Sequence, residues 1–303
     1  MAVTGVDGFV GRHLVRHAHT QGLSVLGVSR SSTPPAEISD LLEDYVSADL
    51  RERWPLSLPP GTVVIHLAGL AAVGPSFADP QEYITSNSQM VTNLCEWLIE
   101  RDRRDVRVLG VSTGAVYEAT GGGSRQSELD AVSFSSPYVV SKALVESQLA
   151  YYRRRGLDNL IARPFNHVGP GQGPGFVVPD LTTALDALAP GTTLTVGDLD
   201  TRRDYTDVRD VVAAYLLLAL RPNPQRHIYN VASGRSRSGR EILALICGAL
   251  ERDVPDLEPD HSRFRVTDPR EIIGDAGALH AETGWLPSIP LEQSIHDFVS
   301  SSR

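Results

Sequence analysis

Lys142 is the only lysine among the 28 lysine and arginine residues of the chain, and it stands four residues after Tyr138. A phenol has an ordinary pKa near ~10 and is a poor acid–base catalyst at neutral pH. An ammonium one helical turn away favours the phenolate, so we expect Lys142 to lower the pKa of Tyr138. Ser136 and Pro137 precede the tyrosine and are typical of a helix N-cap and a first helical residue. The pattern predicts a catalytic pair with Tyr138 in the first turn of a helix.

A glycine-rich turn follows the first expected strand. Gly5 would allow the tight turn, Gly8 would let the backbone approach a pyrophosphate, and Gly11 would let the following helix pack on the strand. Its position between a strand and a helix favours a dinucleotide site over a simple loop. The residues expected to bind the cofactor here are Gly5, Asp7, Gly8, Phe9, Val10 and Gly11.

The end of the second expected strand helps to choose the cofactor. An acidic residue there would bind the ribose 2′-hydroxyl of NAD(H). This chain has Ser29-Arg30 instead, and a cation with hydroxyl groups suits a 2′-phosphate. The residues therefore favour NADP(H), and NAD(H) is the alternative, with Arg30 stacking on adenine. Asp49 and Leu50, after the third expected strand, are expected near the adenine.

Short apolar strands alternate with amphipathic helices in the first half of the chain. Strands without polar alternation, separated by helices, indicate a parallel sheet covered on both faces. The expected fold is therefore α/β, a Rossmann-type doubly wound parallel sheet. The expected strands are residues 2–4, 24–28, 45–48, 63–68, 106–112 and 159–162, and the expected helices include 11–20, 81–100 and 137–155.

The pattern changes after about residue 167, where glycine and proline become dense. We interpret residues 1–167 as a dinucleotide-binding domain. Residues 210–233 contain a helix and a strand (227–231) that we expect to return to its sheet. Residues 168–209 and 234–303 would form a smaller mixed α/β part that binds the substrate.

The bulk composition excludes several classes of protein. The net charge is −9, which argues against general nucleic-acid binding. No apolar run approaches ~20 residues and the N-terminus lacks a secretory pattern, so we expect neither a membrane span nor a secretory signal. Cys95 and Cys247 lie far apart in apolar helical patterns, which indicates reduced core thiols in a cytoplasmic protein. We expect no bound metal.

These pieces together resemble the extended short-chain dehydrogenase/reductases that act on nucleotide sugars, an NAD-dependent epimerase/dehydratase family. The resemblance covers nearly the whole chain and several motifs in order. The matching stretches are Gly5-x-x-Gly8-x-x-Gly11, His66-Leu67-Ala68-Gly69, Ser112-Thr113-Gly114-Ala115-Val116-Tyr117, Tyr138 with Lys142, and Arg163-Pro164-Phe165-Asn166. It implies that Thr113 joins Tyr138 and Lys142 in catalysis. It also implies that Leu67, Ala68 and Gly69 bind the cofactor together with Tyr138 and Lys142, with Lys142 holding the nicotinamide ribose.

Within that family the chain is most similar to GDP-4-dehydro-6-deoxy-D-mannose reductases. The resemblance rests on residues 166–172, residues 175–180, residues 203–210 and the closing Thr283-Gly284-Trp285-x-Pro287. Glu118 departs from the glycine usual at its position, so we expect the loop 118–135 to differ from that of the family. The substrate-binding residues that the resemblance implies are Ser76, Asn87, Asn166, His167, Val177, Arg203, Arg265 and Asp268. Arginine forks such as Arg203 and Arg265 would neutralise a diphosphate.

The residues after Thr113 limit the reaction. The related 4,6-dehydratases need a carboxyl group there for acid–base work, and this chain has Gly114-Ala115. Hydride transfer with one proton transfer remains. The sequence therefore predicts an NADP(H)-dependent reductase of the 4-keto group of a nucleotide 4-keto-6-deoxyhexose, most simply GDP-4-keto-6-deoxy-D-mannose. The alternatives are an NAD-dependent 4-epimerase and a non-catalytic nucleotide-sensing module.

The two long helices also predict an assembly. Residues 81–100 and 137–155 resemble the helices that pair across the dimers of this family as a four-helix bundle. Apolar residues recur in them at helical spacing, and a second apolar side would need a partner. We expect a homodimer. The apolar residues are Tyr83, Ile84, Val91, Leu94, Leu98, Leu144, Leu149 and Tyr152.

Overall fold

The computed structural model describes residues 1–118, 123–189, 191–264 and 269–302. Seven parallel strands form its main sheet, in the order β10-β6-β5-β4-β1-β2-β3. This arrangement confirms the expected doubly wound parallel fold. The strands are β1 (Ala2–Thr4), β2 (Leu26–Ser29), β3 (Asp44–Ser47), β4 (Val63–His66), β5 (Arg107–Val111), β6 (Asp158–Pro164) and β10 (Ile228–Val231).

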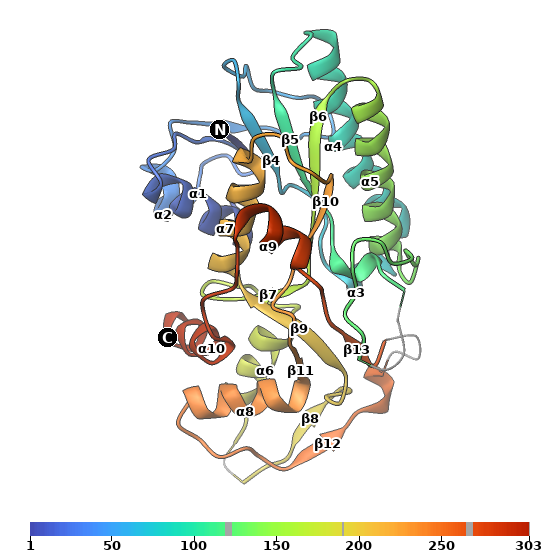
Figure 1. Cartoon of the computed structure of the whole chain (residues 1–303). Coiled ribbons are helices and arrows are strands. Elements are labelled where there is room, and N and C mark those ends of the chain that lie inside the picture. The colour runs from blue at the N-terminus through green and yellow to red at the C-terminus, as the bar shows by residue number, and fades with distance from the viewer. Residues whose placement is uncertain (119–122, 190, 265–268, 303) are drawn as a thin grey trace.

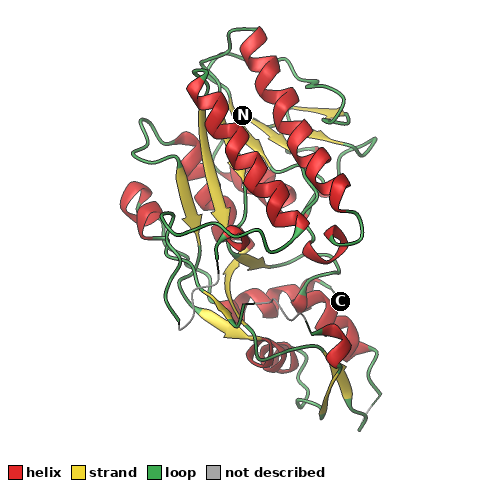
Figure 2. Cartoon of the chain, turned by 90° about the vertical axis from the view of Figure 1, so that its right-hand side faces the viewer, coloured by secondary structure: helices red, strands yellow, loops and turns green. Residues whose placement is uncertain are grey.

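Helices cover both faces of this sheet (Figure 1). Successive strand residues point to opposite faces, so Ile65 packs into one core and Val64 into the other. On the Ile65 side lie α1 (Phe9–Thr20), α7 (Val208–Leu220) and α9 (Gly277–Thr283). On the Val64 side lie α4 (Pro80–Glu100) and α5 (Pro137–Arg154), side by side (Figure 2). The short helices α2 (Ala36–Ser39) and α3 (Val73–Ser76) lie in the connections.

The two long helices begin where the sequence provides caps. The Ser136 hydroxyl accepts a hydrogen bond from the Val139 amide at the start of α5, and Pro137 is the first helical residue. Asp79 accepts from the Glu82 amide at the start of α4 in the same way. These caps satisfy amides that the helices cannot pair internally. The prediction that Tyr138 lies in the first turn is therefore confirmed.

A second, smaller part lies beside the carboxyl ends of the main strands, in the lower half of Figure 1. Its apolar core includes Leu185, Ile242, Ile246, Ile295 and Phe298. Its helices are α6 (Val177–Asp186), α8 (Gly239–Ala249) and α10 (Leu291–Ser301). Its strands are β7 (Asn166–Val168), β9 (Arg202–Asp207), β11 (Ser236–Ser238) and β13 (Glu271–Ile272) in one sheet, and β8 (Leu194–Val196) with β12 (Leu257–Pro259) in another.

Cys95 and Cys247 are both buried and unbridged. In the part of the chain that the structure describes, no helix is long and apolar enough to cross a membrane. Among the same described residues, no cluster of His, Cys, Asp and Glu is arranged to hold a metal ion.

Candidate active site

The glycine turn lies at the mouth of a cavity of about 180 Å³ at the carboxyl ends of β1 to β4. Gly5 has a left-handed backbone (φ 70°), and a Cβ atom there would lie 3.0 Å from the Ala68 amide nitrogen. A Cβ on Gly11 would lie only 2.1 Å from the Gly5 carbonyl oxygen. Both positions therefore require glycine. Gly8 is exposed at the cavity wall, where a pyrophosphate could approach its backbone.

Most of the predicted cofactor residues line this one cavity. Phe9 and Val10 instead begin α1 and are half-buried beside the main core. The Asp7 carboxylate accepts a hydrogen bond of 2.7 Å from Ser31, which ties the turn to the end of β2. The predicted residues that line the cavity are Gly5, Asp7, Gly8, Arg30, Asp49, Leu50, Leu67, Ala68 and Gly69.

Sequence reasoning missed an ion-pair bridge across the same cavity. Arg51 donates to both carboxylate oxygens of Asp49 and, from Nη1, to Glu82 of α4 at 2.8 Å. The Arg51 guanidinium is the main cause that lowers the pKa of Asp49. Ser86 and Met90 of α4 complete this wall. The spacing of Glu82, Ser86 and Met90, four residues apart on one helix, is the signal that could have found them.

Thr113 and Tyr138 meet at the carboxyl end of β5. Thr113 follows β5, and its hydroxyl accepts from the Ala115 amide at 3.1 Å. A hydrogen bond from Thr113 stabilises the Tyr138 phenolate. Tyr138 lies in an apolar cluster with Tyr83, Val116, Tyr117, Val139, Phe165 and Ala232. The site thus brings together a hydroxyl and a phenol with little water around them.

The expected effect of Lys142 on Tyr138 is wrong for this structure. Burial raises the pKa of Tyr138 to about 12, and the Thr113 hydrogen bond offsets only part of that rise. The Lys142 ammonium instead donates to the Val111 carbonyl oxygen at 2.9 Å. Desolvation disfavours the charged phenolate, and this effect on the pKa is larger than that of a distant positive charge. Tyr138 is therefore a neutral phenol at neutral pH, able to donate a proton.

Lys142 itself is buried between α5 and the main sheet. Burial lowers its pKa to about 8, while the charge of Glu146 raises it. Its Nζ atom lies 3.7 Å from where a Cβ on Gly69 would be, so it sits beside the cofactor cavity. His66 is also buried there, hydrogen-bonded to Thr4 at 2.9 Å, and burial lowers its pKa to about 3.

Two residues expected to bind substrate use their polar atoms inside the protein. Asn87 accepts from the Leu70 amide at 2.8 Å and donates to the Leu70 carbonyl and to Ser141. Ser76 is fully buried and donates to the Val73 carbonyl at 2.6 Å. These bonds make Asn87 a brace between the loop after β4 and α5. A substrate contact by either residue would require it to exchange them.

Asn166 and His167 lie where the main sheet meets the smaller part. Asn166 is exposed at the start of β7. The His167 ring stacks on Phe9 with centroids 6.1 Å apart, and its Nδ1 lies 3.1 Å from the Phe165 carbonyl oxygen. His13 also reaches this loop, with its Nε2 at 2.8 Å from the Pro170 carbonyl oxygen. Helix α1 and the segment from β7 to Pro170 are therefore fixed against each other.

Two further predicted substrate residues, Val177 and Arg203, lie in the smaller part. Val177 begins α6. Arg203 lies in β9 and donates to the carbonyl oxygens of Arg202 at 2.8 Å and Pro269 at 2.9 Å. Arg265 and Asp268 lie outside the described residues. The structure thus brings the predicted cofactor and catalytic residues together at the carboxyl ends of the main strands.

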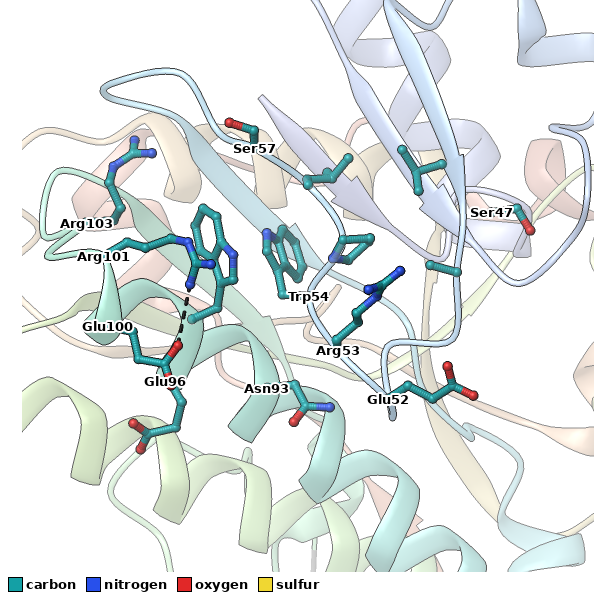
Figure 3. A pocket seen from close by; sticks show the side chains of 15 residues that line it. Ser47, Glu52, Arg53, Trp54, Ser57, Asn93, Glu96, Glu100, Arg101 and Arg103 are labelled. Carbon is teal, nitrogen blue, oxygen red and sulfur yellow. Dashed lines mark hydrogen bonds and ion pairs between the residues drawn. The ribbon is translucent and has the colours of Figure 1, made fainter.

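A wider cavity of about 830 Å³ lies beyond β3 (Figure 3). The loop after β3 and one face of α4 form its walls. Trp54 of the loop and Trp97 of α4 line it, with ring centroids 6.3 Å apart. Arg101 lies over the Trp97 ring at 4.8 Å and pairs with Glu100. None of the predicted site residues lines this cavity, but it adjoins the cofactor cavity at Ala48, which lines both.

The chain is similar to known proteins over nearly its whole length. Residues 1–232 match the model of the NAD dependent epimerase/dehydratase family. A GDP-6-deoxy-D-mannose reductase of Pseudomonas aeruginosa is 34% identical, over 98% of this chain and 95% of its own length.

Two solved structures show the same fold. The structure of RMD from Pseudomonas aeruginosa complexed with NADPH has a TM-score of 0.79 and 30% identity, covering 99% of this chain and 98% of that one. A UDP-glucose 4-epimerase of Thermus thermophilus in complex with NAD has a TM-score of 0.84 and 26% identity, covering 99% and 97%. The expectation of an NAD(P)-dependent enzyme is confirmed: the chain belongs to the NAD dependent epimerase/dehydratase family.

Proposed function

We propose that this enzyme reduces the 4-keto group of a nucleotide 4-keto-6-deoxyhexose, most simply GDP-4-keto-6-deoxy-D-mannose, with NADPH. The observation that carries the proposal is the set of groups around Tyr138. A neutral phenol and the Thr113 hydroxyl meet, and the two residues that follow, Gly114 and Ala115, bring no titratable side chain. Such a site can move one proton, and positions 114 and 115 lack the carboxyl group that a dehydration would use there.

The glycine turn and the cavity beside it support a site for the pyrophosphate and adenosine half of a dinucleotide. The left-handed Gly5 and the crowded Gly11 hold a turn that a side chain would block, and the exposed Gly8 faces the cavity. Arg30 stands at the end of β2, where it would pair with a 2′-phosphate. A bound NADPH would supply the hydride.

The chain's own residues would then complete the reduction. Tyr138 would donate its phenolic proton to the oxygen of the keto group as negative charge develops there. Thr113 would donate a hydrogen bond to the same oxygen. Lys142 would hold the ribose of the cofactor beside Gly69, within its reach in the described structure. Gly114 allows Phe165 to pack closely behind this group, since a Cβ there would lie 2.7 Å from the Phe165 ring.

We further propose that the smaller part binds the nucleotide sugar. Residues 168–209 and 234–303 form this part, and 1–167 with 210–233 form the dinucleotide-binding domain. Asn166 and His167 begin β7, directly after Phe165, which packs in the apolar cluster with Tyr138. Arg203, together with Arg265 and Asp268, would neutralise and position the diphosphate. The protein would act in the cytoplasm as a homodimer.

A 4-epimerase is the second candidate, because the shape of the chain matches the NAD-bound epimerase at a slightly higher TM-score than the reductase. A screen of nucleotide keto-sugars that follows NADPH absorbance separates the two. A reductase consumes one NADPH for each GDP-4-keto-6-deoxy-mannose. An epimerase would purify with bound NAD and interconvert two sugars without consuming added cofactor, and that result would overturn the reductase.

A further inference from the structure

A buried ion pair lies behind Lys142, and the proposed reaction does not use it. Glu146 stands one helical turn after Lys142 in α5. Arg163 of β6 donates to the two carboxylate oxygens of Glu146 at 2.9 and 2.6 Å. The Glu146 side chain is only 10% exposed and the Arg163 side chain only 4%. Taking two charges out of water costs about as much as their attraction returns. Stability alone therefore does not explain why the pair is there.

The arginine of this pair is itself held in place. Arg163 donates from Nη1 to the Tyr117 hydroxyl at 2.9 Å, and its guanidinium lies 4.8 Å above the Tyr117 ring. Tyr117 donates in turn to Asn230 at 2.6 Å. The Asn230 amide donates to the carbonyl oxygens of Gln126 at 2.9 Å and Asp275 at 3.1 Å. The Glu146 carboxylate is thus fixed by a network that reaches five other segments of the chain, at Arg163, Tyr117, Asn230, Gln126 and Asp275.

The fixed carboxylate lies on the same side of α5 as the only lysine. Residues four apart on a helix are neighbours. Within the described residues, Lys142 and Glu146 form no direct ion pair, since Lys142 donates to Val111 and Glu146 accepts from Arg163. The ammonium remains available to a ligand while it feels the negative charge one turn away.

The other titratable groups near the Lys142 ammonium carry no compensating negative charge. His66 of β4 is neutral, because burial lowers its pKa to about 3. Tyr138 of α5 is neutral as well, with a pKa raised to about 12, and burial also raises the pKa of Tyr83 on α4. Glu146 is the carboxylate that opposes the desolvation of Lys142.

We propose that Glu146, clamped by Arg163 and Tyr117, is a positioning residue that keeps the buried Lys142 ammonium charged for the cofactor. The inference rests on the proposed function in that it takes Lys142 as the group that holds the cofactor ribose. A neutral amine would lose the charge that favours this contact. The affinity for the cofactor should then fall as the pH rises through the pKa of Lys142.

The single lysine makes a direct test available. Lysine labelled with ¹³C at the ε carbon gives one side-chain signal, which needs no assignment, and its shift against pH reports the pKa of Lys142. In the unaltered protein we expect a midpoint well below the ordinary ~10.4. Glu146→Gln removes the nearby negative charge, so we expect its midpoint to fall by about one pH unit, roughly a tenfold change in the protonation equilibrium. The pH at which NADPH affinity declines should fall with it.

Two further variants make the result specific. Glu146→Asp keeps the charge and should restore most of the midpoint. Glu96→Gln is the matched control, because Glu96 lies on α4 and pairs with Arg155. It should leave the midpoint unchanged. An unchanged midpoint in Glu146→Gln, or an equal fall in Glu96→Gln, would overturn the proposal.

Glu146→Gln leaves the Arg163 charge unpaired in the core, and such a charge can prevent folding. In that case the double variant Glu146→Gln with Arg163→Gln removes both charges together. Glu146, and not Arg163, is a cause that raises the pKa of Lys142, so the midpoint should still fall, by less than in the single variant. An unchanged midpoint there counts against the proposal in the same way. The NMR signal requires neither sugar nor cofactor. A failure of the proposed reduction, seen as no NADPH consumption, is therefore distinguishable from a failure of this inference.

Discussion

Tyr138 combines a high pKa with a place in the first turn of α5, so its proton stays on the phenol until a strong base forms beside it. The developing alkoxide of a keto group is such a base. We expect Tyr138→Phe to lower the turnover of the keto-sugar nucleotide at least ~10²-fold, because positioned general acids contribute about 10²–10⁴. NADPH affinity, measured by fluorescence, should change little. A variant with near-full turnover would remove Tyr138 from this role.

Arg30 carries the choice of cofactor. Its pairing with a 2′-phosphate would contribute roughly 1.5–3 kcal/mol, so we expect Arg30→Ala to weaken NADPH about 10- to 150-fold. NADH lacks the phosphate and should lose much less affinity. Titration of both cofactors against the variant measures the difference. Equal losses would show that Arg30 only stacks on adenine.

For single residues, the sequence was informative where a motif specifies the chemical role of its members. The glycine turn, Arg30 and Asp49 could be placed at one cavity because parallel strands end at the same edge. The Arg51 bridge and the polar bonds of Asn87 could not, since each depends on which residues of α4 face the sheet ends. The pKa of Tyr138 was mispredicted because spacing gives a neighbour but says nothing about desolvation.

Among the elements, the strand–turn–helix unit at the start of the chain has little room for an added side chain. A methyl group on Gly11 would press on the Gly5 carbonyl and the Val6 backbone. We expect Gly11→Ala to displace the turn and to lower cofactor affinity at least ~10-fold, a loss of about 1.4 kcal/mol. Cofactor titration and thermal unfolding both report it.

The matched control for this change is Gly248→Ala in α8, where a methyl group would meet nothing within 4 Å. Alanine should stabilise that helix by about 0.5–1 kcal/mol and leave cofactor affinity unchanged. If both alanine variants bound the cofactor like the parent protein, close packing of the turn would not be what shapes the site.

The order of elements could be predicted well from hydrophobic patterns, and the main strands and long helices lie within a few residues of the expected positions. The strands of the smaller part were harder to predict. They are two to six residues long and pair with partners distant in the chain, as β7 does with β9 and β8 with β12. Short segments carry too few residues to show a period, so only tertiary pairing defines them.

For the whole molecule, the pairing of α4 with α5 bears on assembly. Six of the eight apolar residues named for a dimer face are buried in the chain's own core: Tyr83, Val91, Leu94, Leu98, Leu149 and Tyr152. The predicted dimer face included too many residues, because one side of each helix packs against the chain's own sheet. Leu144, at 37% exposed, and Tyr151, at 55%, remain on the outer side.

We therefore expect a homodimer through that outer side, seen by light scattering at micromolar concentration. Leu144→Glu should shift the protein toward the monomer, because it places a charge in the contact. Leu217→Glu is the control, since Leu217 is similarly exposed on α7, which lies against the opposite face of the sheet. A fully active monomer of the unaltered protein would contradict the expected dimer.

The lone lysine has a consequence for proteolysis as well. A protease that cleaves only after lysine has one target bond in the whole chain, and that bond lies inside α5, with a lysine that is 8% exposed. Such a bond can be cut only when the helix opens, so the cutting rate measures the local opening equilibrium. The two fragments, residues 1–142 and 143–303, would appear together. Comparing their yield with and without a bound ligand would report how strongly the ligand suppresses the opening of α5. The measurement needs no label on the protein.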